Sequence, residues 1–179
     1  MNTYQAYETM MNMAKKHKNS PRNYSQVIYL DGKNQKMVWS DGFMLLMHDY
    51  HKSGETRTIN HFGMESSLKY PNYQAVIPED LEEIDTSWDY ANLTDQIRGV
   101  ANTAKKLALF LNYEPGGQGC PFISSKQSQF SFNPYLIKSI LTATKRDISG
   151  IRMSRDRTIM ELEIGTFKLI MVGLRKVEK

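Results

Sequence analysis

The chain of 179 residues has little cysteine and no long apolar run. Its single cysteine, Cys120, cannot form an internal disulfide, and the flanking glycines and proline from Gly116 to Pro121 are typical of a loop rather than of an activated thiol. No apolar stretch approaches the roughly 20 residues that cross a bilayer, and the N-terminus lacks the order of a signal peptide. We therefore expect a cytoplasmic protein with no membrane partner.

The chain also lacks a strong excess of charge of either sign. The formal net charge is +4, with 40% hydrophobic and 23% charged residues, as in an ordinary globular protein. A mild positive charge does not by itself select a nucleic-acid partner.

Catalytic motifs are missing as well. The glycine-rich residues 116–119 lack the lysine of a phosphate-binding loop, and no nucleophile elbow is present. His48 and His51 are three residues apart on a predicted strand, where their side chains point to opposite faces and disfavour a metal site. Glu161 and Glu163 are expected to point outward and keep their strand soluble. We expect no enzyme, no metal and no cofactor.

The first part of the chain predicts one helix followed by a meander. Tyr4, Tyr7, Met10, Met11 and Ala14 recur at helical spacing, and the helix is expected to end before proline 21. Residues 27–30, 37–40 and 43–50 are β-prone, and two Asp-Gly pairs, at 31–32 and 41–42, are strong hairpin signals.

The last part repeats this order. Residues 130–132 read as a strand, Asn133 caps a helix with Pro134 in its first turn, and strands are expected at 148–153, 158–164 and 167–174. The sequence therefore predicts an α+β fold in which a helix and an antiparallel three-strand meander occur twice.

The stretch between the two copies is less regular. It has an acidic segment at 79–85, a predicted helix at 89–106, an apolar run at 107–111 and a loop at 113–125. We place a soft boundary near residue 85, which gives two halves, 1–85 and 86–179, or one continuous domain.

Three separated segments carry a family resemblance. They are residues 39–45 (WSDGFML), residues 70–78 (YPNYQAVIP), and a third that runs from 132–136 (FNPYL) to the closing strand at 167–175 (FKLIMVGLR). In this order they resemble the bacterial sliding clamp, the beta subunit of DNA polymerase III. The second segment is the most specific, because its two aromatics and two prolines have no purely structural necessity in a sheet protein.

The chain departs from this family in several places. Family members have three domains of two such halves each, whereas this chain has room for about one and a half domains. Gln74 stands where the family has arginine, and Val172 and Gly173 replace a closing proline motif. Such a shortened, divergent relative would suit a phage or prophage, and its ring closure and subunit number stay open.

The resemblance implies an apolar pocket for short linear motifs of polymerases and clamp loaders. Adaptable methionines and a backbone-exposing glycine suit that role. The same residues would also serve as ordinary core and turn residues, and this alternative stays open. The matching positions are Gly42, Phe43, Met44, Leu45, Val76, Pro78, Leu169 and Met171.

The resemblance also implies a cationic surface that contacts duplex DNA without reading bases, through counterion release. The alternative is that these cations are solvated or complement helix dipoles. The candidates lie on or just after predicted helices: Lys15, Lys16, Lys18, Arg22, Arg98, Lys105, Lys106, Lys138, Lys145 and Arg146.

The resemblance thus implies a homo-oligomeric processivity factor for DNA replication. One alternative is a clamp-like interaction module without a ring, or a replication inhibitor. Another is a phage structural or accessory α+β protein unrelated to clamps.

Overall fold

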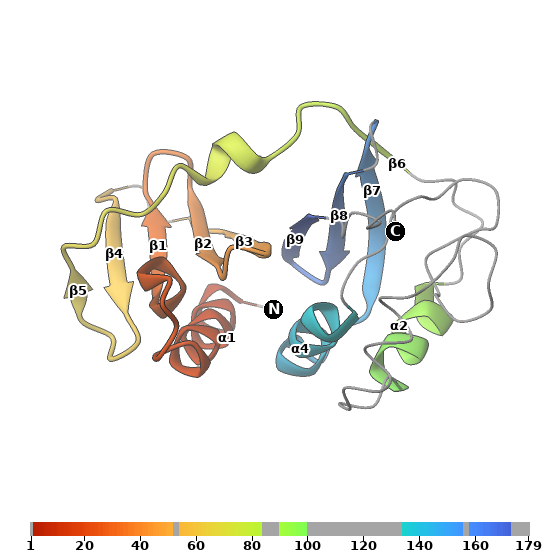
Figure 1. Ribbon diagram of the computed structural model, residues 1–179, viewed down its shortest axis with the longest axis horizontal. Helices are drawn as coiled ribbons and strands as arrows, with labels where there is room; N and C mark the ends of the chain where they lie inside the picture. The colour runs from red at the N-terminus through yellow and green to blue at the C-terminus, as the bar shows by residue number, and fades with distance from the viewer. Residues whose placement is uncertain (1, 52–53, 84–89, 100–133, 156–157, 173–179) are drawn as a thin grey trace, which may run out of the picture. The chain divides into compact units, whose positions relative to one another are not determined.

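A computed structural model describes residues 2–51, 54–83, 90–99, 134–155 and 158–172. These residues form an α+β fold in which nine strands contribute to an antiparallel sheet, with few helices (Figure 1). The predicted fold class is confirmed. The chain divides into two compact units: unit 1 is Met1–Ile77 with Gly165–Ile170, and unit 2 is Pro78–Ile164 with Met171–Lys179.

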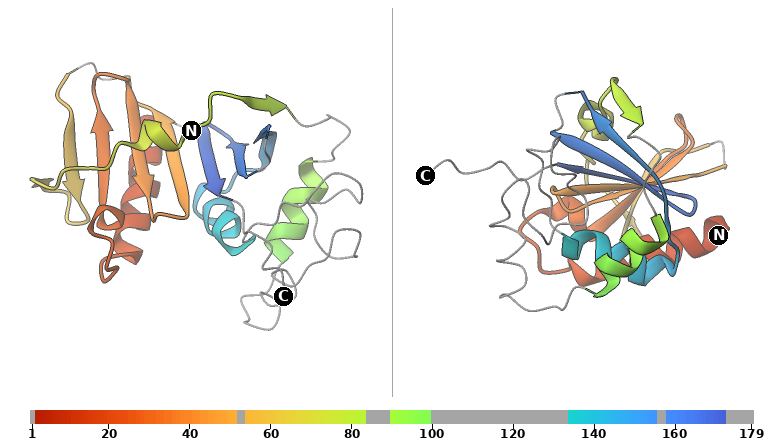
Figure 2. Two further views of the ribbon diagram at one scale, coloured as in Figure 1. Left: turned by 45° about the horizontal axis from the view of Figure 1, so that its top comes forward. Right: turned by 90° about the vertical axis from the view of Figure 1, so that its right-hand side faces the viewer.

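Unit 1 begins with helix α1, Thr3–Lys16, which starts at a capping box: the Asn2 side chain accepts from the amide of Gln5, and the Gln5 side chain accepts from the amide of Asn2. Helix α1 contacts strands β1, β2 and β3 and covers one face of their sheet (Figure 2). Its buried side is made mainly of alanine and methionine. The helix ends before proline 21, as predicted.

The strands of unit 1 follow a short 3-10 helix, η1. Their order in the sheet is β5-β4-β1-β2-β3-β9. In the core, Trp39 is fully buried, faces Leu46 across the β2–β3 pair, and donates from its indole nitrogen to the carbonyl of Ser25 at 2.9 Å. The bounds are η1 Asn23–Gln26, β1 Val27–Asp31, β2 Lys36–Ser40, β3 Met44–Asp49, β4 Arg57–Asn60, β5 Glu65–Ser66 and β9 Phe167–Val172, of which 167–170 belong to unit 1.

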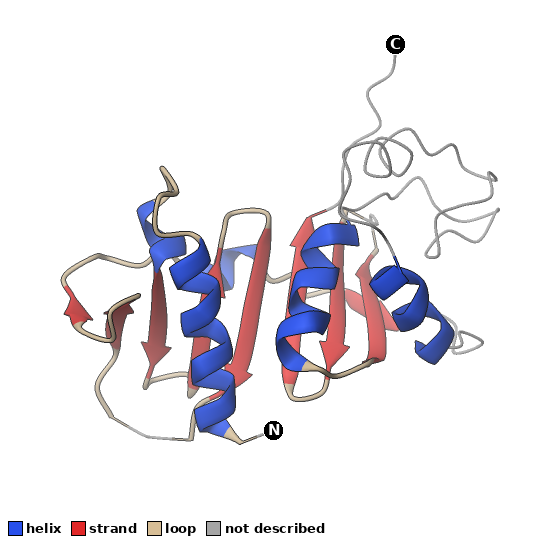
Figure 3. Cartoon of the chain, turned by 90° about the horizontal axis from the view of Figure 1, so that it is seen from below, coloured by secondary structure: helices blue, strands red, loops and turns tan. Residues whose placement is uncertain are grey.

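Unit 2 pairs its strands in the order β8-β7-β6. Helix α2 contacts α4 and β7, and Figure 3 shows both helices on one face of the strands. The buried side of α4 includes Ile137, Ile140 and Leu141. The bounds are β6 Leu81–Glu83, α2 Tyr90–Gly99, α4 Pro134–Thr144, β7 Ile148–Ser154 and β8 Ile159–Ile164.

The predicted strands at 27–30, 37–40, 43–50, 148–153, 158–164 and 167–174 correspond to β1, β2, β3, β7, β8 and β9. Strands β4, β5 and β6 were not predicted, and β6 lies inside the acidic segment. The predicted helix at 89–106 contains α2. Residues 100–133, with the predicted apolar run, the loop and the strand at 130–132, lie outside the described residues.

One prediction about unit 2 is wrong. Glu161 does not point outward: its residue is only 3% exposed, and its carboxylate forms an ion pair with Arg152. The register places Arg152 of β7 directly opposite Glu161 of β8, so the guanidinium neutralises the buried charge. Glu163 lies 3.8 Å from the same guanidinium and keeps 44% of its side chain exposed.

Across the part of the chain that is described, no helix is both long and apolar enough to span a membrane.

Candidate functional site

The Asp41–Met44 turn of unit 1 connects β2 to β3 and is held by its own side chains. The Asp41 carboxylate is buried and accepts from the amides of Phe43 at 2.8 Å and Met44 at 3.0 Å. The Ser40 hydroxyl donates to the carbonyl of Met44 and accepts from the amide of Gly42. These bonds fix the turn in one conformation.

Gly42 is required at the tip of this turn for two reasons. Its φ of +89° lies in the left-handed region, and a Cβ there would stand 2.6 Å from the Tyr24 hydroxyl and 3.1 Å from the Arg22 side chain. The absence of a side chain therefore lets η1 and the residue before it approach the hairpin closely.

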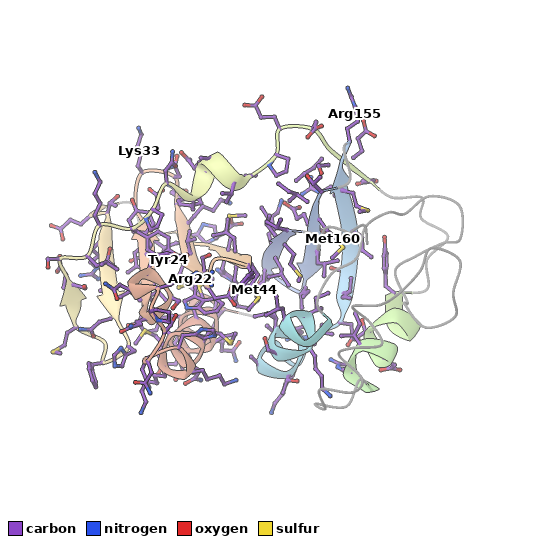
Figure 4. The ribbon with its side chains drawn as sticks, viewed as in Figure 1. Arg22, Tyr24, Lys33, Met44, Arg155 and Met160 are labelled. Carbon is purple, nitrogen blue, oxygen red and sulfur yellow. The ribbon has the colours of Figure 1, made fainter. Side chains whose placement is uncertain are left out.

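Arg22 covers Phe43, the most exposed apolar side chain of the turn. Its guanidinium carbon lies 4.4 Å from the centroid of the Phe43 ring, and its Nη1 donates to the carbonyl of Asp41 at 3.0 Å. Phe43 remains 55% exposed. Figure 4 labels Arg22, Tyr24 and Met44 in this part of unit 1.

The Tyr70–Tyr73 segment has a structural role, which corrects the expectation that its pattern had none. The Tyr73 hydroxyl donates to the Asp31 carboxylate at 2.9 Å, in the first hairpin. The Tyr70 ring stacks on Tyr29 at 5.1 Å and meets Tyr24 edge-on at 6.5 Å, beside the second hairpin. The segment therefore fastens both Asp-Gly hairpins to the 3-10 helix η2, Tyr73–Val76.

Asp31 is the polar centre of this arrangement. Burial by itself would raise its pKa, but hydrogen bonds from the side chain and amide of Asn34, the Tyr73 hydroxyl and the amide of Lys33 outweigh burial and lower the pKa. In turn, burial and the Asp31 carboxylate raise the pKa of Tyr73. Asp31 is therefore a charged acceptor that organises the first hairpin.

The predicted pocket residues differ in exposure. Phe43 and Val76 are 55% and 49% exposed, Gly42 is exposed, and Pro78 is half-buried. Met44, Leu45, Leu169 and Met171 are buried. Six of the eight belong to unit 1, and Pro78 and Met171 belong to unit 2.

Sequence reasoning missed two residues in relation to this site. Arg22 was assigned to a DNA surface, and Tyr24 was not singled out. Both lie against Gly42 because of the way the segment around η1 packs, and no local sequence signal shows that contact.

The cations predicted to face DNA fall into separate groups in unit 1. Lys15 and Lys16 are exposed in the last turn of α1, where they complement the helix dipole, and Lys18 is exposed just after it. Arg22 differs from them because it lies on the Phe43 ring.

The unit 2 cations differ in their partners. Arg98 pairs with Asp147 at 2.8 Å and donates to the carbonyl of Arg146 at 3.2 Å, which joins α2 to the start of β7. Lys145 and Arg146 are exposed after α4, and Lys138 is half-buried on it. Lys105 and Lys106 lie outside the described residues.

His48 is a packing residue of unit 1. The residue is 6% exposed, its ring meets Phe167 of β9 edge-on at 5.3 Å, and burial lowers its pKa. Within the described ranges, no three His, Cys, Asp or Glu side chains gather where they could hold a metal ion.

Known proteins were compared with the chain at three levels. No protein-family model matches the sequence, and no curated protein matches it. Solved structures do match. The DNA polymerase III beta subunit of Thermotoga maritima aligns over 99% of this chain and 65% of its own, with a TM-score of 0.59 and 14% identity.

Two further structures agree with the first. The DNA polymerase III beta chain of Streptococcus pneumoniae aligns over 96% of this chain and 63% of its own, with a TM-score of 0.61 and 12% identity. The Helicobacter pylori beta clamp bound to a DNA ligase peptide aligns over 95% and 62%, with a TM-score of 0.59 and 10% identity.

The chain spans less than two thirds of the length of each of these three proteins. At 10 to 14% identity the likeness concerns the fold alone. The chain therefore has the fold of the bacterial DNA polymerase III beta sliding clamps over nearly its whole length.

Proposed function

We propose that this protein is a clamp-like processivity factor, which assembles from several copies around duplex DNA and binds partner peptides at the Asp41–Met44 turn. The observation that carries the proposal is the alignment of 95 to 99% of the chain with beta sliding clamps. One of these clamps was solved with a DNA ligase peptide.

The shape of unit 1 supports a peptide-docking role. The turn is fixed by the Asp41 carboxylate and by Ser40, while Phe43 and Val76 expose apolar surface. A preformed turn with exposed apolar side chains loses little entropy on binding. In this proposal Gly42 adds to the docking surface, and the buried Met44, Leu45 and Leu169 belong to the core of the same unit.

The DNA-contacting role rests on four exposed lysines and one exposed arginine. Lys15, Lys16 and Lys18 lie at one end of α1, and Lys145 and Arg146 lie after α4. Contacts of this kind carry affinity without sequence preference. The affinity falls as salt rises, and each phosphate contact that is lost makes the plot of log affinity against log salt concentration less steep by roughly 0.9.

Retention on circular DNA tests this function. A ring slides without dissociating for topological reasons, so it stays on a nicked circular plasmid and runs off the same plasmid after linearisation. We expect a solution mass of several copies by light scattering, and loss of the retained protein on linearisation. A strict monomer at high concentration that binds no polymerase-derived peptide would refute the proposal.

A second candidate is an interaction module that binds partner peptides without forming a ring. The fixed Asp41–Met44 turn with its exposed Phe43 favours it, because peptide docking at this turn requires no ring. Peptide binding by a monomer or open dimer, with equal release from circular and linear DNA, would select this candidate.

A further inference from the structure

The geometry of the Asp41–Met44 turn points to a charge requirement in the partner. We infer that Arg22 recognises a carboxylate next to the apolar anchors of the bound peptide, so that the site selects acidic peptides. This inference rests on the proposed peptide-docking function.

The first argument is the position of Arg22. Its guanidinium is held by the Phe43 ring on one side and by the carbonyl of Asp41 at 3.0 Å, yet the residue is exposed. Among the described residues no carboxylate forms an ion pair with it. A guanidinium oriented in this way presents further N–H donors in a fixed fork, which is the geometry that binds a carboxylate.

The second argument is the charge of the surrounding segment. Between Glu8 and Asp31 the chain contains no acidic residue, whereas it carries Lys15, Lys16, Lys18 and Arg22. The Asp41 carboxylate, the acidic group nearest in sequence to Phe43, is buried and turned to the amides of Phe43 and Met44. A negative ligand therefore meets attraction along this segment.

The exposed Phe43 ring beside Arg22 favours a peptide over DNA as the ligand. A phosphate contact needs a cation but gains nothing from an exposed aromatic ring, whereas a peptide side chain would cover the 55% of Phe43 that stays exposed. Because Arg22 contacts both the Phe43 ring and the Asp41 carbonyl, a cation and an exposed aromatic surface lie side by side. An acidic residue beside an aliphatic or aromatic anchor would satisfy both.

Two synthetic peptides test the inference, each with leucine and phenylalanine anchors, one with aspartate and the other with asparagine beside them. We expect the wild-type protein to bind the aspartate peptide about five- to tenfold more tightly. Arg22→Gln should abolish this preference, so that the variant binds the two peptides with about equal affinity. Arg22→Lys, which keeps the charge but not the planar fork, should retain part of it.

Lys18→Gln is the matched control, because it removes a cation from the same segment and leaves the Asp41–Met44 turn unchanged. This variant should still prefer the aspartate peptide over the asparagine peptide. Near-ultraviolet circular dichroism checks that each variant keeps its tertiary packing. Equal preference in wild type and Arg22→Gln would overturn the inference. So would an Arg22→Gln protein with unchanged peptide selectivity and weaker binding to duplex DNA, which would make Arg22 a phosphate contact.

The outcomes also separate this inference from the proposed function. If both peptides bind the wild-type protein equally well, docking stands and the acidic preference is refuted. If neither peptide binds, peptide docking and the charge preference are refuted together.

Discussion

The two units differ in the interactions that predominate between their strands, although unit 1 also has the Lys36–Asp49 ion pair and unit 2 also has hydrogen bonds between Ser154 and the backbone of Ile159. Unit 1 fastens its hairpins with buried carboxylates that accept backbone amides, and with the tyrosines of the 70–73 segment. Unit 2 joins β6, β7 and β8 with ion pairs, of which Arg152 with Glu161 is the most buried and Arg155 with Glu82 the most exposed. Short directional bonds define a turn conformation closely, whereas exposed charges tolerate rearrangement.

This difference agrees with placing the docking site on unit 1. A site that receives a short peptide needs a preformed shape, and the Asp41 bonds provide it. Substitutions in each unit test whether this contrast holds.

Removing the Asp41 carboxylate should have the largest effect. Asp41→Ala leaves the amides of Phe43 and Met44 without their acceptor, and we expect a loss of about 2–3 kcal/mol in the free energy of unfolding. Urea denaturation measures it. Asp41→Asn keeps the acceptor oxygen and should lose less than about 1 kcal/mol. Equal losses in both variants would mean that the charge, rather than the amide bonds, holds the turn.

Removing the Tyr73 hydroxyl should have the next largest effect. Tyr73→Phe takes one donor from the Asp31 carboxylate, and we expect a loss of about 1–2 kcal/mol in denaturant unfolding. Tyr70→Phe is the control, because its buried hydroxyl makes no hydrogen bond of normal geometry among the described residues and has only a weaker interaction with the backbone of Ser40, so it should change stability by less than about 0.5 kcal/mol. The reverse order of the two losses would contradict the role given to Asp31.

Acid should weaken unit 1 through His48. Burial lowers the pKa of His48, so the unfolded chain takes up a proton first as the pH falls. The stability from neutral His48 is therefore complete above about pH 6.5 and is lost as the pH falls through the native pKa. Asp49, His51 and the N-terminal amine act on the same group.

The measurement is thermal unfolding of wild type and His48→Gln between neutral and mildly acid pH. The variant should lose part of the slope of stability against pH in this range. The lowered pKa values of Asp31 and Asp49 act only at more acid pH, near and below about 4. An unchanged slope in the variant would show that His48 does not titrate on unfolding.

The smallest effect is expected at the exposed ion pair of unit 2. Arg155 and Glu82 are 76% and 63% exposed, so Arg155→Gln should cost about 0.5 kcal/mol or less. High salt should remove the difference, since exposed charges are screened. The Asp41→Ala loss in unit 1 should instead persist at high salt. Equal salt sensitivity of the two losses would remove the contrast between the units.

The sequence predicted the parts of the fold that depend on local signals. Helix α1 and strands β1 to β3 follow from helical spacing and from Asp-Gly turns, which act over a few residues. Strands β4 and β5 are four and two residues long and give no clear alternation. Strand β6 lies in an acidic segment, and its pairing with β7, with Glu82 next to Arg155, joins residues far apart in sequence.

The candidate site was predicted in part. The Asp-Gly turn was found from its sequence, but the contact of Arg22 with Asp41 spans 19 residues and depends on how η1 packs. The burial of Glu161 was missed for the same reason, since its partner Arg152 lies on another strand. Such pairings depend on tertiary register, which single-sequence patterns do not contain.

Peptide binding to one pair of variants tests the central claim most directly. Phe43→Asp replaces the exposed ring of the proposed docking turn with a carboxylate, and Phe62→Asp makes the same change at another exposed phenylalanine of unit 1, which is 73% exposed. With the aspartate peptide, measured by fluorescence anisotropy, we predict a loss of at least about tenfold for Phe43→Asp and wild-type affinity for Phe62→Asp. Wild-type affinity in Phe43→Asp, or equal losses in both variants, would contradict docking at the Asp41–Met44 turn.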